Sequence, residues 1–495
     1  MTADVALSPR RQRLLLAAIM SGLLLSMLDQ TVVGTALPTI IRSLGGTDLY
    51  VWAVTAYLVP ATVSLPVYAR LSDRYGRRAL LLFGMTLFLV GSAGAATSPS
   101  MTALIGWRAL QGLGAGALEG LSFILVADLY AGKNNASLQG AMAGLMGVSF
   151  IAGPLIGGFL TDHVGWRSVF LVNLPVGLAA VAVVASVLPG SIGRSEDRRT
   201  PLDLAGILLL TLAVGLMLLG LNEHSRADAG GGMPSWTVLR TGGFVLAGLV
   251  LVPVFLAVEA RAAAPIMPLR LFTQRATGAM LAAGATVTFG LFATILLVPR
   301  YFQVVEGISA TQSGVLVYPL MLGLLVAVNV GAMLIIRLSD FRIVLLIGTA
   351  LTALGAIGFS TFDASTPRWQ SLVFMGLMGV GIGPALSGLQ IAIRSRVAPS
   401  DIGAAMGTLL LLRQVGGSIA LAAAETVYAA GLHPGVPGST ATATGHGVFA
   451  IALAGALLAA AAVLAVPRGG ARIVLGPSPG AVAPDRAGEP ARVAT

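Results

Sequence analysis

Apolar stretches long enough to cross a lipid bilayer recur along almost the whole chain, and they constrain its fold more than any other feature. A membrane-spanning helix needs about 20 mostly apolar residues. Hydrophobic residues make up 56% of the 495 residues and charged residues only 10%, whereas soluble domains carry about 25% charged residues. A chain with so little charge cannot cover a water-exposed surface. The sequence therefore predicts an integral membrane protein.

Fourteen candidate spans predict an all-α membrane protein with fourteen transmembrane helices. They cover residues 14–37, 50–69, 79–96, 103–127, 137–160, 169–188, 202–221, 238–258, 276–299, 311–336, 343–362, 370–393, 402–428 and 446–466. An even number of spans places both termini on the same side. The Gly-rich segments 222–237 and 430–445 are expected to be mobile loops on the opposite side.

The distribution of arginine predicts on which side of the membrane the two termini lie. The terminal segments and the loops on their side hold 22 of the 30 Lys and Arg residues. The opposite loops hold Arg42, Arg167, Arg226, Arg240, Arg300 and Arg368. Cytoplasmic loops carry such an excess of positive charge, so both termini are expected in the cytoplasm.

The abundance of Arg, Ala and Gly favours a bacterial inner membrane. Without a patch of basic and aromatic residues, the net charge of +10 does not indicate nucleic-acid binding.

A short repeat suggests that the chain contains two related halves. The sequence Arg-Leu-Ser-Asp at Arg70–Asp73 recurs at Arg337–Asp340, each time after the second span of a set of six. Duplicated six-helix halves are a transporter architecture. The expected organisation is a cytoplasmic arm at 1–13, a six-helix half at 14–188, a linker with inserted helices 7 and 8 at 189–275, a second half at 276–466 and a disordered cytoplasmic tail at 467–495.

Ionisable residues inside the spans are candidate site residues, because each is costly to insert into a membrane. Asp29 lies in span 1, and Arg108 and Glu119 lie in span 4. At 100° per residue, Arg108 and Glu119 share one helix face with Gln111 nearby, about 16 Å apart along the axis. Asp29 and Arg108 lie at similar depths and are able to pair. Such groups form either structural ion pairs or a proton and substrate site.

Span 13 contributes two further ionisable residues. Arg413 is expected to line the cavity from the second half, whereas Glu425 lies near the outer end and either joins the site or extends to the membrane surface. Asp203 and Asp401 are expected to stabilise helix starts.

Two more groups of residues allow a structural and a functional interpretation. The cytoplasmic segment after span 2, with the end of span 4, forms either ordinary positive anchors or a breakable cytoplasmic gate. The gate residues are Asp73, Arg74, Gly76, Arg77, Arg78 and Asp128. Gly153, Pro154, Gly157 and Gly158 in span 5 permit close helix packing, with or without a role in transport.

These motifs resemble the major facilitator superfamily, in particular its fourteen-span drug:proton antiporter branch. The resembling segments are Leu28–Pro38, Ala69–Arg78, Arg108–Gly112, Gly153–Gly158, Gly165–Arg167, Asn173–Pro175, Leu202–Gly206 and Arg413–Gly417. Ala69, Gly34 and Ser149 depart from the family pattern, each by exchange of one small residue for another. The resemblance implies proton transfer at the Arg108 segment and an antiporter role for the span 5 motif.

The sequence therefore predicts a monomeric, proton-coupled exporter of drugs or other lipophilic organic compounds. An exporter of lipids or cell-envelope precursors, and an importer on the same fold, remain alternatives. The chain has no Cys, no P-loop and no metal-ligand spacing among its four His. We therefore expect neither an enzyme nor a metal or cofactor site.

Overall fold

The computed structural model describes residues 8–46, 49–129, 135–190, 203–229, 242–262, 265, 267–398, 401–433, 436 and 438–466. Within these ranges the chain is helical and contains no β-strand. The helices are α1 (Pro9–Leu44), α2 (Tyr50–Tyr75), α3 (Arg77–Ala96), α4 (Met101–Leu129), α5 (Asn135–His163), α6 (Ser168–Leu171), α7 (Asn173–Val187), α8 (Leu204–Ala229), α9 (Gly242–Glu259), α10 (Arg270–Thr273), α11 (Arg275–Thr286), α12 (Phe289–Val304), α13 (Ala310–Leu316), α14 (Tyr318–Leu338), α15 (Phe341–Phe359), α16 (Arg368–Arg394), α17 (Ile402–Gly431) and α18 (Ser439–Leu464).

Eleven of the described helical segments are long and apolar enough to cross a membrane. Some of them contain breaks that the sequence analysis does not predict. The expected span 276–299 corresponds to α11 and α12, and the span 311–336 to α13 and α14. Shorter apolar segments lie in α2 at Tyr50–Leu65 and in α8 at Ala205–Leu221. The all-helical membrane fold is confirmed, and the number of fourteen spans stays a prediction.

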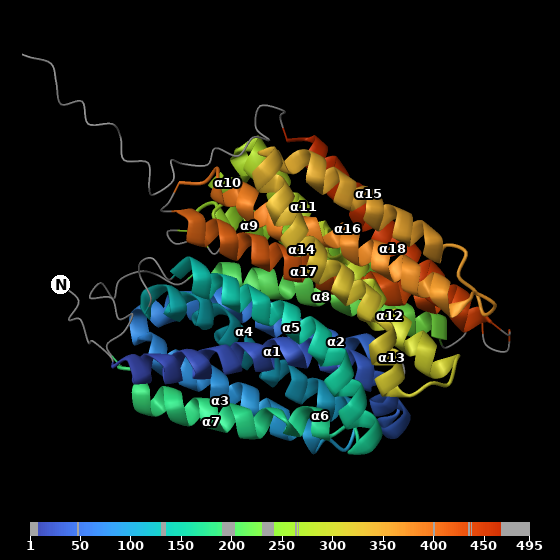
Figure 1. The fold of residues 1–495 in the computed structure, drawn as a ribbon, viewed down its shortest axis with the longest axis horizontal. Coiled ribbons are helices and arrows are strands. Elements are labelled where there is room, and N and C mark those ends of the chain that lie inside the picture. The colour runs from blue at the N-terminus through green and yellow to red at the C-terminus, as the bar shows by residue number, and fades with distance from the viewer. Residues whose placement is uncertain are drawn as a thin grey trace, which may run out of the picture.

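The helices form two bundles (Figure 1). Helices α1–α7 pack mainly against one another and form the N-terminal bundle, and α11–α18 form the C-terminal bundle. Helices α8 and α9 pack together, and α8 contacts both α2 and α17. Following the arginine distribution, we call the end at which α1 begins the cytoplasmic side and the opposite end the outer side.

Several expected loops are helical. Residues 222–229 continue α8, and residues 439–445 form the first turns of α18. Between α2 and α3 only Gly76 is non-helical, with φ +90°, a conformation that glycine adopts without strain. These differences arise because a helix can extend beyond the hydrocarbon core, so hydropathy marks the core and not the helix ends. The expected tail at 467–495 lies outside the described residues.

The two aspartates expected at helix starts behave differently. The Asp203 carboxylate accepts a hydrogen bond from the Gly206 backbone N–H at 2.8 Å, so it caps α8 at the helix start where the sequence places it. Asp401 precedes α17 but makes no side-chain cap. It pairs instead with Arg270 at 2.6 Å, and its place at the N-terminus of α17 agrees with the expected position at a helix start.

Candidate functional site

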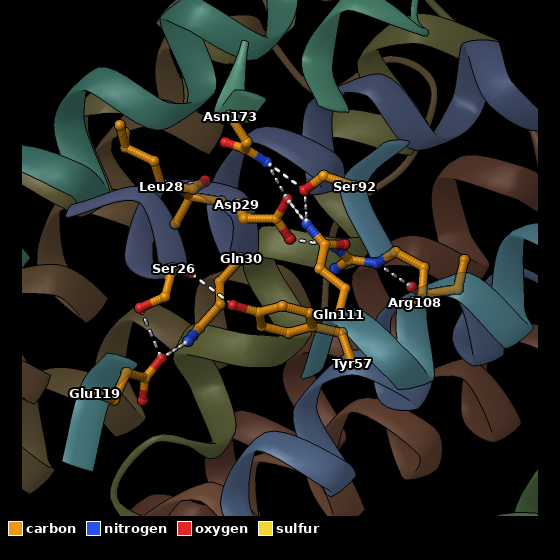
Figure 2. A network of polar contacts seen from close by, with 12 residues as sticks. Ser26, Leu28, Asp29, Gln30, Tyr57, Ser92, Arg108, Gln111, Glu119 and Asn173 are labelled. Atoms are coloured by element: carbon orange, nitrogen blue, oxygen red, sulfur yellow. Dashed lines mark hydrogen bonds and ion pairs between the residues drawn. The ribbon is translucent and has the colours of Figure 1, made fainter. Parts of the chain in front are cut away.

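Asp29 of α1 and Arg108 of α4 form a buried ion pair in the N-terminal bundle (Figure 2). Asp29 is 2% exposed and Arg108 1% exposed. A buried charge is tolerated only with a partner and further hydrogen bonds. The Arg108 guanidinium also donates to the Ala53 carbonyl at 3.2 Å and to the Gln111 side-chain oxygen at 2.7 Å. The structure therefore brings together the two residues that the sequence places at the same depth.

Two neutral side-chain amides donate hydrogen bonds to the Asp29 carboxylate. Its second oxygen accepts hydrogen bonds from Gln111 at 2.8 Å and from Asn173 of α7 at 3.2 Å. Both amides also contact the Ser92 hydroxyl of α3, at 2.8 and 3.1 Å. Helices α1, α3, α4 and α7 thus meet in one hydrogen-bond network. Helix α3 joins this network through Ser92, which bonds the two amides and not the carboxylate itself.

An aromatic ring supports the cation of this pair. The guanidinium carbon of Arg108 lies 4.3 Å from the centroid of the Tyr57 ring. A buried arginine over an aromatic face is stabilised electrostatically. The Tyr57 hydroxyl donates to the Ser26 carbonyl of α1 at 2.8 Å. Tyr57 therefore connects α2 to the same network.

Glu119 lies deeper in α4 and belongs to a separate group of contacts. It is 4% exposed. Among the described side chains, its hydrogen-bond donors are Gln30 at 2.8 Å and Ser26 at 3.4 Å, both neutral (Figure 2). Glu119 thus shares a helix with Arg108 but has no contact with it. This carboxylate has hydrogen bonds but no cationic partner within the described part of the chain.

The two ionisable residues of α17 are both buried. The Arg413 guanidinium donates to the Leu386 carbonyl of α16 at 3.3 Å. Glu425 is 7% exposed and pairs with Arg300 of α12 at 2.8 Å. The interpretations of Glu425 as a surface residue and of Arg300 as a loop residue are therefore wrong. Pairing removes the need for either side chain to reach water, and hydropathy alone cannot reveal a partner 125 residues away.

Five of the expected cytoplasmic gate residues lie at the junction between α2 and α3, and the sixth, Asp128, lies near the end of α4. The Gly76 backbone N–H bonds the Ser72 carbonyl at 3.0 Å and ends α2. The Arg78 guanidinium donates to the Ala185 carbonyl of α7, and the guanidinium carbon of Arg74 lies 5.5 Å from the Tyr75 ring centroid. Arg77 begins α3 and is partly buried. The side chains of Asp73 and Asp128 lie outside the described part of the structure.

The span 5 motif packs against two different helices. A β-carbon added at Gly153 would meet Thr31 of α1, and one added at Gly157 would meet Val32, each at less than 3 Å. At Gly158 it would meet the backbone of Ala310 and Thr311 in α13, at 2.5 Å. The motif is therefore a surface of close packing both within the N-terminal bundle and toward the C-terminal bundle.

Pro154 extends this contact between the bundles. Its carbonyl oxygen lies 2.4 Å from the position that a β-carbon on Gly314 of α13 would take. Glycine thus permits close approach of α5 and α13 from both sides.

Hydrogen bonds join the two bundles near their outer ends. The Gln303 amide of α12 donates to the Thr35 carbonyl of α1 at 2.9 Å. The Tyr50 hydroxyl of α2 donates to the Leu296 carbonyl of α12 at 3.3 Å. These contacts hold α1 and α2 against α12.

Asp162, at the end of α5, makes a third contact of this kind. Its carboxylate accepts hydrogen bonds from the backbone N–H groups of Ala310 and Thr311, at 3.1 and 2.7 Å. Thr311 also donates its hydroxyl at 2.5 Å. A residue of the N-terminal bundle therefore caps the first turn of α13.

Substitution of Asp162 by alanine is expected to weaken closure of the outer side. Loss of a helix cap costs about 1 kcal/mol, which corresponds to a roughly fivefold higher ratio of open to closed molecules. The distance between spin labels on the outer ends of the two bundles measures this ratio. Asp162→Glu, which keeps the charge, should shift it less. An unchanged distance distribution in Asp162→Ala would remove the carboxylate from the closing contact.

Sequence reasoning missed several members of these networks. Ser92, Tyr57 and Arg300 carry no signal in a single sequence, because serine, tyrosine and a span-end arginine are ordinary residues there. Asn173 and Gln30 do stand inside segments that resemble the family pattern. Those segments were the available signal for a polar contact.

The family model described as Major Facilitator Superfamily matches residues 19–421. The chain belongs to the Major Facilitator Superfamily. It is thus a multi-pass membrane transporter of a superfamily that handles small organic substrates. The narrower fourteen-span branch is not distinguished by this match.

Curated relatives from this superfamily have names connected with drugs and antibiotics. The chain is 31% identical over 411 residues to the Multidrug transporter protein MdtP of Bacillus subtilis, covering 83% of this chain and 74% of the relative. It is 34% identical over 409 residues to the Tetracenomycin C resistance and export protein of Streptomyces glaucescens, covering 82% and 74%.

Two solved structures of transporters share the fold. An auto-inhibited POT family peptide transporter aligns with a TM-score of 0.64 at 16% identity, over 93% of this chain and 97% of the other. A point mutant of the nucleoside transporter NupG aligns with a TM-score of 0.61 at 13% identity, over 92% and 100%. At these identities the likeness concerns the fold alone.

Proposed function

We propose that this transporter is a proton-coupled exporter of drugs or other lipophilic organic compounds, with both termini in the cytoplasm of a bacterium. The observation that carries the proposal is the buried Asp29–Arg108 pair with its surrounding amides. When Asp29 is protonated the ion pair is lost, and Arg108 keeps its bonds to Gln111 and Ala53 and its contact with Tyr57. The network therefore supports two charge states without leaving the cation unbonded.

The names of the relatives favour export over import. A multidrug transporter and an antibiotic export protein are each at least 31% identical over more than four fifths of this chain. Alternating access then requires that one side opens while the other closes. The contacts at the outer ends of α5, α12 and α13 support a form closed to the outside, and Asp73, Arg77 and Asp128 are proposed to close the cytoplasmic side in the opposite form.

The substrate is proposed to bind between the bundles, near Glu119 and Arg413. Glu119 lies ten residues before the end of α4, and Arg413 lies eleven residues after the start of α17. At 1.5 Å per residue both are about 15 Å from the cytoplasmic ends of their helices. Glu119 supports recognition of a cationic group, because its described contacts leave its charge unpaired. Glu425, also on α17, is proposed to act in the same pathway nearer the outer side.

Transport into inverted membrane vesicles tests this function. Vesicles carrying the protein should accumulate lipophilic dyes when the lumen is made acidic, and dissipation of the pH gradient should stop accumulation. Vesicles without the protein provide the control for passive entry. Accumulation that ignores the pH gradient would contradict proton coupling, and substrate loss from loaded vesicles under the same gradient would indicate an importer.

Glu119→Gln should weaken export of cationic substrates more than export of neutral ones. We expect roughly a tenfold difference, since a desolvated charge contact contributes about 1.4 kcal/mol or more. Rates are compared for a cation and a neutral compound of similar size, normalised to folded protein in the membrane. Glu119→Asp should retain part of the activity. Equal losses for both compounds would assign Glu119 a structural or proton-carrying role instead.

A further inference from the structure

The Arg300–Glu425 pair is a second buried charge site, and one of its walls comes from the other bundle. Arg300 of α12 and Glu425 of α17 are 8% and 7% exposed, with 2.8 Å between Nη1 and Oε1. The guanidinium carbon of Arg300 lies 4.4 Å from the ring centroid of Tyr428 and 4.4 Å from that of Tyr50. Tyr428 belongs to α17, whereas Tyr50 begins α2 in the N-terminal bundle.

Tyr50 is held in this position by both bundles. It is 2% exposed, and its hydroxyl donates to the Leu296 carbonyl one helical turn before Arg300. The ring therefore covers the guanidinium only while α2 lies against α12. Movement of the bundles apart at the outer side must take Tyr50 away from Arg300 and leave Tyr428 in place.

The same helix contacts the other ion pair through a second tyrosine. Tyr57 lies seven residues after Tyr50, so the two side chains project within about 20° of each other around α2. The guanidinium carbon of Arg108 lies 4.3 Å from the Tyr57 ring centroid. The Tyr57 contact lies within one bundle, however, and the Tyr50 contact crosses between the two. Of these two contacts, only the second depends on closure of the outer side.

One oxygen of the Glu425 carboxylate is available to bind water or an ion if solvent reaches the pair. Within the described part of the chain, Oε2 of Glu425 is buried and has no hydrogen-bond partner. Such an oxygen is costly to bury and readily accepts a donor. The two tyrosine rings cover the guanidinium, and both charged side chains are buried from solvent.

We propose that Tyr50 is a positioning residue that seals the Arg300–Glu425 site in the outward-closed form and exposes it when the outer side opens. The proposal rests on the alternating access proposed above. A buried cation over an aromatic ring is stabilised more than an exposed one. The contact therefore favours the closed form, and transport must break it once in each cycle.

Spin-label distances test this in the purified protein, without substrate or pH gradient. The chain contains no cysteine, so Thr97→Cys and Ala364→Cys provide the only labelling sites. Both positions are exposed, between α3 and α4 in one bundle and between α15 and α16 in the other. Tyr50→Leu should raise the ratio of outward-open to outward-closed molecules about tenfold. Tyr50→Phe, which keeps the ring, should shift it less than about threefold.

Two comparisons make the test specific. Tyr428→Leu removes an equivalent ring contact that exists in both forms, so it should shift the ratio much less than Tyr50→Leu. In an Arg300→Gln, Glu425→Gln background, Tyr50→Leu should shift the ratio no more than Tyr50→Phe does, because no cation remains to be covered and only the hydrogen bond to Leu296 is lost. An unchanged ratio in Tyr50→Leu, equal shifts from both tyrosines, or a full shift in the uncharged background would each overturn the proposal.

A second substitution keeps the test possible if Tyr50→Leu does not fold. If Tyr50→Leu does not fold, Tyr50→Met provides an unbranched apolar side chain of similar reach, and the same ratios apply. Failure of the vesicle assay would reject proton-coupled export and leave these distance measurements unaffected. A shift that depends on Arg300 in a protein without proton coupling would therefore still establish the role of Tyr50.

Discussion

Asp29→Asn is expected to abolish substrate accumulation driven by a pH gradient, with roughly a hundredfold or greater loss of rate, to the background of empty vesicles. Asparagine has nearly the shape of aspartate and can still accept hydrogen bonds from Arg108 and Gln111, but it can neither bind nor release a proton. In a proton-coupled exporter this removes the driving force. Exchange of labelled for unlabelled substrate without a gradient should continue, because it requires no change of protonation.

The exchange measurement separates loss of coupling from loss of structure. Removal of one partner from a buried ion pair costs about 3–5 kcal/mol, so Asp29→Asn needs a direct check of folded protein in the membrane. Asp29→Glu keeps the carboxylate and should restore part of the gradient-driven rate. Full accumulation by Asp29→Asn under a gradient would exclude Asp29 as the coupling residue. If Asp29→Asn loses both substrate exchange and gradient-driven accumulation, the role of Asp29 is structural.

The sequence predicts the membrane fold because length, low charge and arginine bias are each direct consequences of the bilayer. It also predicts that Asp29 and Arg108 lie at one depth, since depth follows from the position within a span. Which side chains complete the network depends on helix rotation and packing. Ser92, Asn173 and Tyr57 come from three other helices, and no periodicity in one sequence specifies how those helices face α1.

The α17 residues show the same limit more clearly. Hydropathy correctly places Glu425 near the outer end of its span, and an isolated helix would let it extend to water. The structure instead gives it Arg300, which itself lies inside α12 and not in a loop. A charge near a helix end is therefore ambiguous until the neighbouring helix is known. The same holds for the start of α13, where the partner Asp162 is 148 residues earlier in the chain.

Gly158→Leu should prevent closure of the outer side and stop transport. The added side chain would begin 2.5 Å from the Ala310 carbonyl and the Thr311 backbone, atoms that cannot turn away as a flexible side chain would. If overpacking of this contact costs about 3 kcal/mol, the ratio of closed to open molecules falls roughly a hundredfold. Labels at Thr97→Cys and Ala364→Cys should then report mainly the open form.

Gly106→Leu provides a matched control, because a β-carbon at this exposed glycine of α4 has no neighbour within 4 Å. It adds the same side chain to a spanning helix without touching the other bundle, so its rate and distances should be unchanged. Gly158→Ala tests the smaller change and should shift the ratio in the same direction but less. If folded Gly158→Leu still shows the distances of the closed form, the contact between α5 and α13 accommodates the larger side chain. The role of Gly158 in closure of the outer side would then be rejected.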